Sequence, residues 1–211
     1  MKVIFGTTNK RKIEDLKNLI KILKLNITVF SLNDIGWDNK EIDENGGTLE
    51  ENSLIKANSI LKFCKKNNIC YPILTDDAGL FCNSLNGEPG IFTARYADDE
   101  LSLDSSLPKY QCVVKLLKKL NNFKDRTAVY KCCVTCMFFD GSYFQTNGES
   151  SGYISSSILG PLEKPYFYSV FVLSEYDRTF YELSFSELNN TYRYIALKEA
   201  LNLLLCNNYF K

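Results

Sequence analysis

The first 23 residues, MKVIFGTTNKRKIEDLKNLIKIL, indicate the fold class. The apolar run at 3–5 predicts a short buried strand, and Gly-Thr-Thr-Asn at 6–9 predicts a loop. Beyond the loop, apolar residues recur at the spacing of one helix face: Ile13, Leu16, Leu19, Ile20 and Leu23. This order of strand, loop and helix is typical of α/β proteins.

The same alternation continues along the first half of the chain. ITVFSL at 27–32 predicts a second strand, and Thr48 followed by Glu51 predicts a capping box that begins a helix near residue 49. YPIL at 71–74 predicts a buried strand that ends at Thr75-Asp76-Asp77, before a turn at NGEPG.

The second half adds adjoining strands. We expect a helix over 108–120, a strand over 128–139, a hairpin turn at Gly141-Ser142 and a terminal helix over 194–205. The sequence therefore predicts an α/β fold with a mixed central sheet flanked by helices. No repeat or linker interrupts it, so we expect one domain over 1–211.

Composition excludes several classes of function. The 25 basic and 25 acidic residues cancel, which argues against binding to nucleic acid or to a membrane through bulk charge. The chain has no histidine, which excludes Ser-His-Asp catalysis and His-ligated zinc. The N-terminus lacks a signal-peptide pattern, so we expect a reduced, cytoplasmic protein despite its 8 cysteines.

The pair Cys133 and Cys136 has the spacing of some metal and redox sites. Residues 128–139 are rich in β-branched and aromatic side chains, however, which favours a strand. Positions i and i+3 of a strand point to opposite faces, so the sequence favours core packing of these thiols over a metal site.

Polar and basic residues gather where the first strand meets the first helix. Thr7, Thr8 and Asn9 fill the loop, and Lys-Arg-Lys at 10–12 begins the helix. Cations at a helix N-terminus oppose the helix dipole by about 0.3–1 kcal/mol each, which favours a bound anion such as phosphate. The alternative is an ordinary N-cap followed by solvated cations.

A second cluster combines Glu44 in the preceding loop with Glu51, Asn52 and Lys56 on the helix predicted from residue 49. A spacing of four residues places Asn52 and Lys56 on one helix face, where an amide and an ammonium would meet a phosphate together. A solvated helix face is the alternative.

Asp76 and Asp77 form the third cluster. Adjacent like charges are costly unless a cation or hydrogen-bond donors compensate, and carboxylate oxygens suit Mg²⁺ or Mn²⁺. The alternative is a turn at the end of a strand. If the three clusters converge, they supply what metal-assisted hydrolysis of a phosphoanhydride requires.

Four segments carry a resemblance to a known family: GTTNKRKIE at 6–14, ENGGTLEENSLIKA at 44–57, TDDAGLFCNSLNGEPGIFTARYA at 75–97 and RTAVYKC at 126–132. They are similar in order and spacing to the inosine triphosphate pyrophosphatase (Ham1-like) nucleotide hydrolases. The third segment follows that family's D-D-S-G-L…L-x-G-x-P-G-x-x-S-A-R-[YF] pattern.

The resemblance implies a reaction and roles for individual residues. Water would attack between the α and β phosphates of a nucleoside triphosphate, releasing the monophosphate and pyrophosphate. The phosphates would be held by Thr7, Asn9, Lys12 and Lys56. Glu44 and Asp77 would ligate Mg²⁺, and Asp76 would be a further ligand or would orient the attacking water. Arg95 would lie near the cleft. The family further implies homodimers of an elongated, two-lobed α/β fold with the site between the lobes.

The last third departs from the family at the positions that read the base. The family's F-G-Y-D-P-[IV]-F falls on PYFYSVF at 165–171, without the glycine and the aspartate. Its S-H-R falls on Thr191-Tyr192-Arg193, which keeps only the arginine. Phe167, Tyr168 and Tyr192 would stack on a base, or else belong to the core or the rim.

The leading interpretation is an Mg²⁺-dependent pyrophosphohydrolase acting on purine triphosphates such as ITP, XTP and dITP. A second interpretation keeps the reaction but changes the substrate to another modified or a pyrimidine nucleotide, because a site with other donors and acceptors discriminates differently. A third is a nucleotide-binding protein without catalytic activity.

Overall fold

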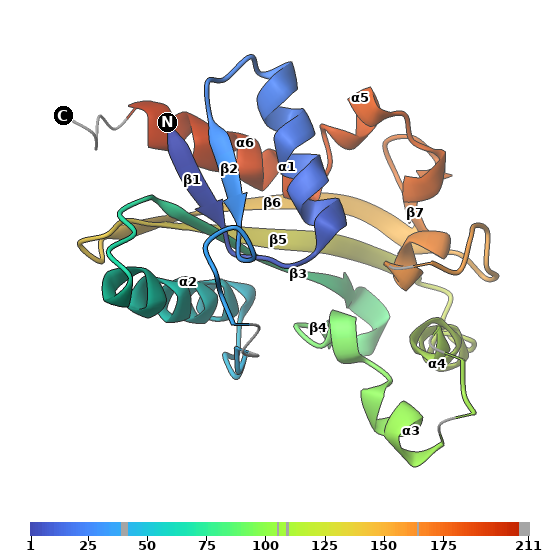
Figure 1. Ribbon diagram of the computed structural model, residues 1–211. Helices are drawn as coiled ribbons and strands as arrows, with labels where there is room; N and C mark the ends of the chain where they lie inside the picture. Colours follow the sequence, from blue (N-terminus) through green and yellow to red (C-terminus); the bar gives the residue numbers. More distant parts are fainter. Residues whose placement is uncertain (39–41, 105, 109, 164, 207–211) are drawn as a thin grey trace. The chain divides into compact units, whose positions relative to one another are not determined.

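A computed structural model describes residues 1–38, 42–104, 106–108, 110–163 and 165–206 (Figure 1). The chain divides into two compact units. Unit 1 comprises Met1–Asp77, Cys132–Gly148 and Arg193–Lys211, and unit 2 comprises Ala78–Lys131 and Glu149–Tyr192. Strands β3 (Ile73–Cys82), β5 (Thr127–Met137) and β6 (Tyr143–Ile154) contribute residues to both.

The sheet of unit 1 begins with the first predicted strands. Strands β1 (Lys2–Phe5) and β2 (Thr28–Ser31) are parallel, and β1 also pairs in parallel with β3. The strand order is β2-β1-β3-β5-β6. Parallel neighbours require crossover connections, which the helices between these strands provide.

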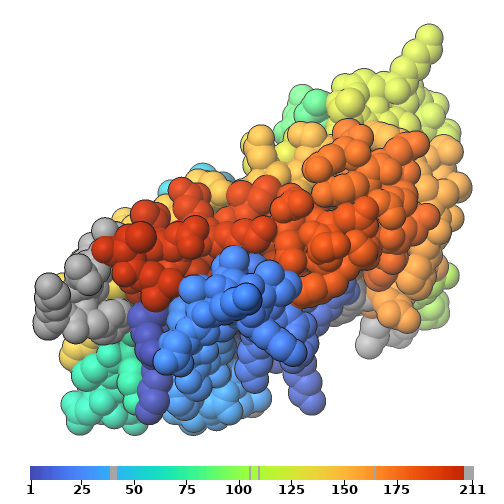
Figure 2. Space-filling view, turned by 90° about the horizontal axis from the view of Figure 1, so that it is seen from above, coloured from blue at the N-terminus to red at the C-terminus, as the bar shows by residue number. Residues whose placement is uncertain are grey.

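Helices cover both faces of this sheet. Helices α1 (Lys10–Ile22) and α6 (Tyr192–Cys206) lie side by side over one face, as Figure 1 and Figure 2 show, and α2 (Leu49–Lys66) lies over the other. Helix α1 buries Leu16, Leu19 and Ile20, which share the face predicted from their spacing. The α2 side of the core is built from apolar residues of both layers: Ile4, Leu32, Ala57, Ile60, Leu61, Cys64, Ile73 and Met137.

The helix starts predicted at residues 10 and 49 are confirmed, and each has a local cause. The Asn9 side chain accepts hydrogen bonds from the backbone N–H of Arg11 and Lys12, so it caps α1. The Thr48 hydroxyl accepts from the backbone N–H of Glu51, so α2 begins at residue 49. The terminal helix is also confirmed as α6.

Unit 2 contains short elements and antiparallel pairs. Its helical segments are η1 (Asn83–Leu85), η2 (Thr93–Arg95), α3 (Asp98–Leu103), α4 (Gln111–Lys119), η3 (Tyr166–Ser169), η4 (Phe180–Glu182) and α5 (Phe185–Leu188). Its added strands are β4 (Pro89–Gly90), β7 (Phe171–Leu173) and β8 (Arg178–Thr179). Antiparallel pairs join β3 to β4, β6 to β7 and β7 to β8, so the predicted mixed sheet is confirmed.

One predicted strand boundary is wrong. Strand β3 does not end at Thr75-Asp76-Asp77 but continues through them to Cys82. Both carboxylates are buried within the strand and each is paired with a lysine. Polar residues therefore do not end the strand here, because cations from neighbouring helices compensate their charge.

The cysteines of β5 are core residues, as the sequence favoured. Cys133 and Cys136 are fully buried. Burial raises the pKa of the Cys136 thiol to about 12, which keeps it protonated and unreactive at neutral pH. Within the described part of the chain, no helix combines the length and apolar character needed to cross a bilayer.

Candidate functional site

Unit 1 contains a pocket of about 480 Å³, a volume within the range typical of small-molecule sites. Its polar lining comes from the β1–α1 loop and from α1, α2, β3 and the loop before α2: Thr7, Thr8, Lys12, Glu44, Lys56 and Asp76. The pocket therefore brings together members of all three polar clusters that the sequence singled out.

Gly6 follows β1 and belongs to the lining of the pocket. A Cβ atom at this position would lie 2.5 Å from Ile60 Cδ1 and 2.6 Å from Thr75 Cγ2. Only glycine fits at this distance without displacing its neighbours, so the close approach of β1, β3 and α2 depends on it.

The loop that follows Gly6 is arranged by local hydrogen bonds. Thr7 Oγ1 accepts a hydrogen bond from the backbone N–H of Asn9 at 3.1 Å, and the Asn9 side chain caps α1. Thr7 and Thr8 line the pocket, whereas Asn9 is exposed and occupied as the N-cap. In this arrangement Asn9 orients the loop whose neighbouring threonines face the pocket.

Asp76 is held by cations on the α1 side of the sheet. Lys12 Nζ lies 2.9 Å from both carboxylate oxygens, and an Arg193 guanidinium nitrogen lies 3.6 Å from Oδ2. Burial alone would raise the pKa of the Asp76 carboxyl, but the charges of Lys12, Arg193 and Lys56 outweigh it and hold the pKa below its ordinary value. Burial also lowers the pKa of Lys12, against the attraction of Asp76.

Asp77 pairs with a different helix. Lys56 Nζ lies 2.7 Å from Asp77 Oδ1, 2.9 Å from Glu44 Oε2 and 3.0 Å from the backbone oxygen of Asp76. Although burial opposes it, the attraction of these carboxylates raises the pKa of Lys56. Burial raises the pKa of Asp77, since it outweighs the effect of Lys56. Asp77 Oδ2 is buried without a hydrogen-bond partner.

These oxygens fit a hard divalent cation. Glu44 and Asp77 approach the same ammonium, and the unpartnered Oδ2 of Asp77 is a free ligand atom. Among the described residues no three acidic or thiol side chains form a metal cage. Mg²⁺ does not require one, because it is usually bound through one or two carboxylates with water and substrate phosphates completing its coordination.

The other residues of the second cluster shape the loop before α2. Asn52 is buried, and its Oδ1 accepts a hydrogen bond from the backbone N–H of Gly46 at 2.9 Å. Glu51 Oε2 accepts from the backbone N–H of Gly47 at 2.6 Å. Asn52 therefore positions the loop that carries Glu44. It neither lines the pocket beside Lys56 nor lies on a solvated helix face, the two alternatives that the sequence left open.

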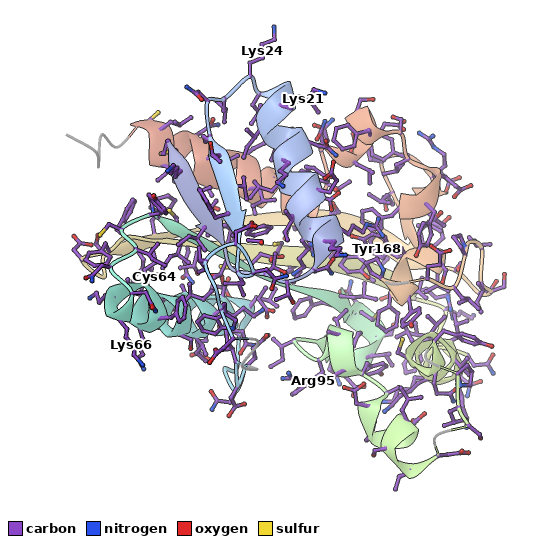
Figure 3. The ribbon with its side chains drawn as sticks, in the orientation of Figure 1. Lys21, Lys24, Cys64, Lys66, Arg95 and Tyr168 are labelled. Carbon is purple, nitrogen blue, oxygen red and sulfur yellow. The ribbon has the colours of Figure 1, made fainter. Side chains whose placement is uncertain are left out.

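Lysines also lie at the C-terminal ends of α1 and α2, away from the pocket. Figure 3 shows Lys21 and Lys24 at the far end of α1, and Lys66 at the end of α2. Cations are favourable near a helix C-terminus, so these lysines need no ligand to explain them.

The remaining predicted site residues lie in unit 2, apart from Arg193. The Arg95 guanidinium lies 5.2 Å from the centre of the Phe92 ring (Figure 3). Thr191 is buried, and its hydroxyl donates to the backbone oxygen of Leu188 at 2.7 Å.

Phe167, Tyr168 and Tyr192 are buried in the aromatic core of unit 2. The hydroxyls of Tyr168 and Tyr192 lie 2.6 Å apart. Tyr130 stacks on Tyr192, and Phe180 stacks on Tyr168. Their packing is that of core residues, the alternative that the sequence left open, and their contact with a base stays a prediction.

Sequence reasoning missed the apolar lining of the pocket, which consists of Leu32, Trp37 and Ile42. A signal was present, because Trp37 is the one tryptophan of the sequence and lies in a glycine-containing loop outside any apolar period.

Known proteins resemble this chain over nearly its whole length. The model of the Ham1 family matches residues 3–203. The dITP/XTP pyrophosphatase of Leuconostoc mesenteroides is 35% identical over 204 residues, covering 94% of each chain. That of Clostridium perfringens is 35% identical, covering 89% of each. The solved Ham1 protein of Staphylococcus aureus superposes with a TM-score of 0.79 at 26% identity, covering 98% of this chain and 100% of that one. The chain therefore belongs to the Ham1 family.

Proposed function

We propose that this protein is a nucleoside triphosphate pyrophosphohydrolase that converts dITP- and XTP-type purine triphosphates to the monophosphate and pyrophosphate. The observation that carries the proposal is the pocket of unit 1, where two lysines pair with adjacent aspartates beside a threonine-rich loop. The names of the relatives, which are dITP/XTP pyrophosphatases, support the substrate class.

The lysines and threonines would bind the polyphosphate. Lys12 lies in the first turn of α1, which contains no acidic residue, so its charge and the helix dipole both attract an anion. Thr7 and Thr8 add hydroxyl donors to the lining of the same pocket. Lys56 adds a second ammonium, and its raised pKa keeps it charged at neutral pH.

Glu44 and Asp77 would hold Mg²⁺ or Mn²⁺ through their carboxylate oxygens. When bound, the cation would neutralise phosphate charge and lower the pKa of the attacking water. Lys56 contacts both carboxylates and so keeps them close together.

We infer a positioning role for Asp76. Both of its carboxylate oxygens accept hydrogen bonds from Lys12, and Arg193 approaches Oδ2. These contacts support a role for Asp76 in fixing the side chains of Lys12 and Arg193. They favour this role over that of a metal ligand, which the sequence also allowed.

The base preference has a specific alternative. The positions at which the family resemblance placed base contacts carry Tyr168 and Tyr192, whose hydroxyls contact one another within the core of unit 2. This pairing favours a second candidate function, the same hydrolysis of another modified or a pyrimidine nucleotide.

A homodimer, which the family resemblance implies, is checked by light scattering on the purified protein.

A substrate panel tests the proposal. Pyrophosphate release is measured with ITP, XTP and dITP, and with the standard ribonucleoside and deoxyribonucleoside triphosphates. Each is assayed in Mg²⁺ and in EDTA. Metal-dependent release that favours ITP, XTP and dITP is expected. Preferred release from another nucleotide would support the second candidate, and no release from any of them would contradict both.

A further inference from the structure

Three hydroxyl side chains are fully buried where α2 meets the sheet of unit 1. Ser53 of α2, Thr75 of β3 and Thr135 of β5 are each 0% exposed. They lie outside the lining of the pocket, and the proposed function gives them no part in binding or catalysis. Burying a hydroxyl costs free energy unless it is hydrogen-bonded, and an apolar side chain would fill the same space without that cost. Filling the core therefore does not explain this hydroxyl cluster.

The hydroxyl cluster joins α2 to the sheet through directed hydrogen bonds. Ser53 Oγ donates to the Thr75 backbone oxygen at 3.2 Å, and Thr75 Oγ1 donates to the Ser53 backbone oxygen at 2.7 Å. The backbone N–H and the hydroxyl of Thr135 both donate to Ser53 Oγ, at 3.1 Å and 2.8 Å. Gln145 Nε2 donates to Thr135 Oγ1 at 3.0 Å and to the Glu50 backbone oxygen of α2 at 2.8 Å. Each hydroxyl proton of the cluster therefore has an acceptor, and each bond fixes a direction as well as a distance.

The Ser53–Thr75 pair lies next to an ion pair of the site. Ser53 and Lys56 are three residues apart on α2, so they are neighbours on one helix face. Thr75 and Asp77 are two residues apart on β3, so they share one face of the strand. The two pairs therefore join the same face of α2 to the same face of β3. A shift of α2 along β3 would break the hydroxyl pair, and it would also carry Lys56 away from Asp77 and from the Asp76 backbone oxygen.

We propose that Ser53 is a positioning residue for Lys56. Its hydroxyl sets the register of α2 on β3 and so holds the Lys56 ammonium where it meets the phosphates, without itself touching the ligand. Apolar packing is non-directional and tolerates sliding, whereas the hydrogen bonds of Ser53 to two strands are satisfied in one register. The inference rests on the proposed function, since it takes Lys56 as a phosphate-binding group.

Calorimetry on the purified protein tests this role. The probe is an ITP analogue with a methylene group between the α and β phosphorus atoms, added in the presence of Mg²⁺. Ser53→Ala removes the hydroxyl and should weaken binding of the analogue roughly tenfold, the scale of one hydrogen bond to a charged group. Ser59→Ala is the matched control, because it makes the same change on the same helix at a half-buried position outside the hydroxyl cluster. It should leave the Kd of the analogue unchanged.

A double-mutant cycle separates positioning of Lys56 from general support of the fold. If Ser53 acts through Lys56, Ser53→Ala should add no further loss of affinity once Lys56→Gln has removed the ammonium. A residue that only stabilises the fold would weaken binding by the same factor in both backgrounds. Thr75→Val is a second variant, nearly equal in volume, that removes the hydroxyl donating to the Ser53 backbone oxygen. Its loss of affinity should depend on Lys56 in the same way.

The outcomes separate this inference from the proposed function. Unchanged affinity in Ser53→Ala, or equal losses with and without the Lys56 ammonium, would overturn the positioning role while leaving the phosphate site intact. If Ser53→Ala does not fold, Thr75→Val decides by the same two criteria. If the analogue did not bind the unsubstituted protein, the proposed function would fail and this inference with it.

Discussion

Asp76 and Asp77 are adjacent in β3, yet they pair with lysines from opposite faces of the sheet. Side chains of consecutive strand residues alternate between faces, so Asp76 meets Lys12 of α1 and Asp77 meets Lys56 of α2. Figure 1 shows these two helices on the two faces of the unit 1 sheet. One strand thereby ties both helices to a single pocket, which neither aspartate could do alone.

The Asp77→Asn variant tests the proposed ligand. The amide keeps the size of the side chain but removes the charge that a divalent cation and Lys56 both require. We expect pyrophosphate release to fall by at least about a hundredfold, the scale seen when a charge-stabilising group is lost, while the circular dichroism spectrum stays unchanged. Asp99→Asn removes an exposed carboxylate paired with Lys115 and should keep full activity. Retained turnover in Asp77→Asn would rule out this assignment.

The effects of substituting Lys12 and Asp76 on the free energy of unfolding should not be additive, because the two side chains form an ion pair. Lys12→Met leaves a buried carboxylate with Arg193 at 3.6 Å as its remaining cation on that side. We expect a loss of about 2–4 kcal/mol in the free energy of unfolding, because a buried charge loses its partner. The double variant Lys12→Met/Asp76→Asn should lose clearly less than the sum of the single losses in urea denaturation. Additive losses would show that the pair does not interact as the geometry indicates.

Much of the fold was predictable because its signals are local. The caps at Asn9 and Thr48 depend on neighbours within three residues, and both helix starts were found from the sequence. The end of β3 was not found, because Asp76 and Asp77 look like the polar end of a strand. What keeps them inside it are lysines distant in the sequence, and no local pattern encodes that pairing.

The site was predictable where residue type alone indicates the chemistry. Lys12, Glu44, Lys56 and Asp76 were singled out by residue type, and they line one pocket, a convergence that the sequence left open. Trp37 was missed, because a loop aromatic acquires its place only when Phe63 of α2 packs against it.

Gly6→Ala should destabilise the protein without touching any charged group. The added Cβ would collide with Ile60 Cδ1 and Thr75 Cγ2. Overpacking of this kind costs about 1–3 kcal/mol. Thermal unfolding measures the loss, and the double variant Gly6→Ala/Ile60→Val, which removes the contacting methyl group, should recover part of it. Gly47→Ala is the control, since its nearest contact would be an ordinary 3.5 Å; an equal loss there would contradict the packing argument.

The effects of removing the Tyr168 and Tyr192 hydroxyls on stability should also depend on one another. Either single Tyr→Phe change removes one partner of a buried 2.6 Å hydrogen bond and should cost about 1 kcal/mol of stability. Removing both hydroxyls should cost less than the sum of the two single losses of stability. The double variant leaves neither hydroxyl of this pair buried without the other. Chemical denaturation of the four proteins gives the coupling. The same variants in the substrate panel test the base contact: a changed ratio of ITP to dGTP turnover would show that these tyrosines act on the substrate.

The products of ITP hydrolysis show which phosphoanhydride bond the protein cleaves. The reaction is followed by phosphorus NMR with Mg²⁺ present, so that every phosphorus-containing product is identified. We expect IMP and pyrophosphate in equal amounts, with no accumulation of IDP. Release of IDP and orthophosphate, or no reaction of any nucleoside triphosphate, would contradict this expectation.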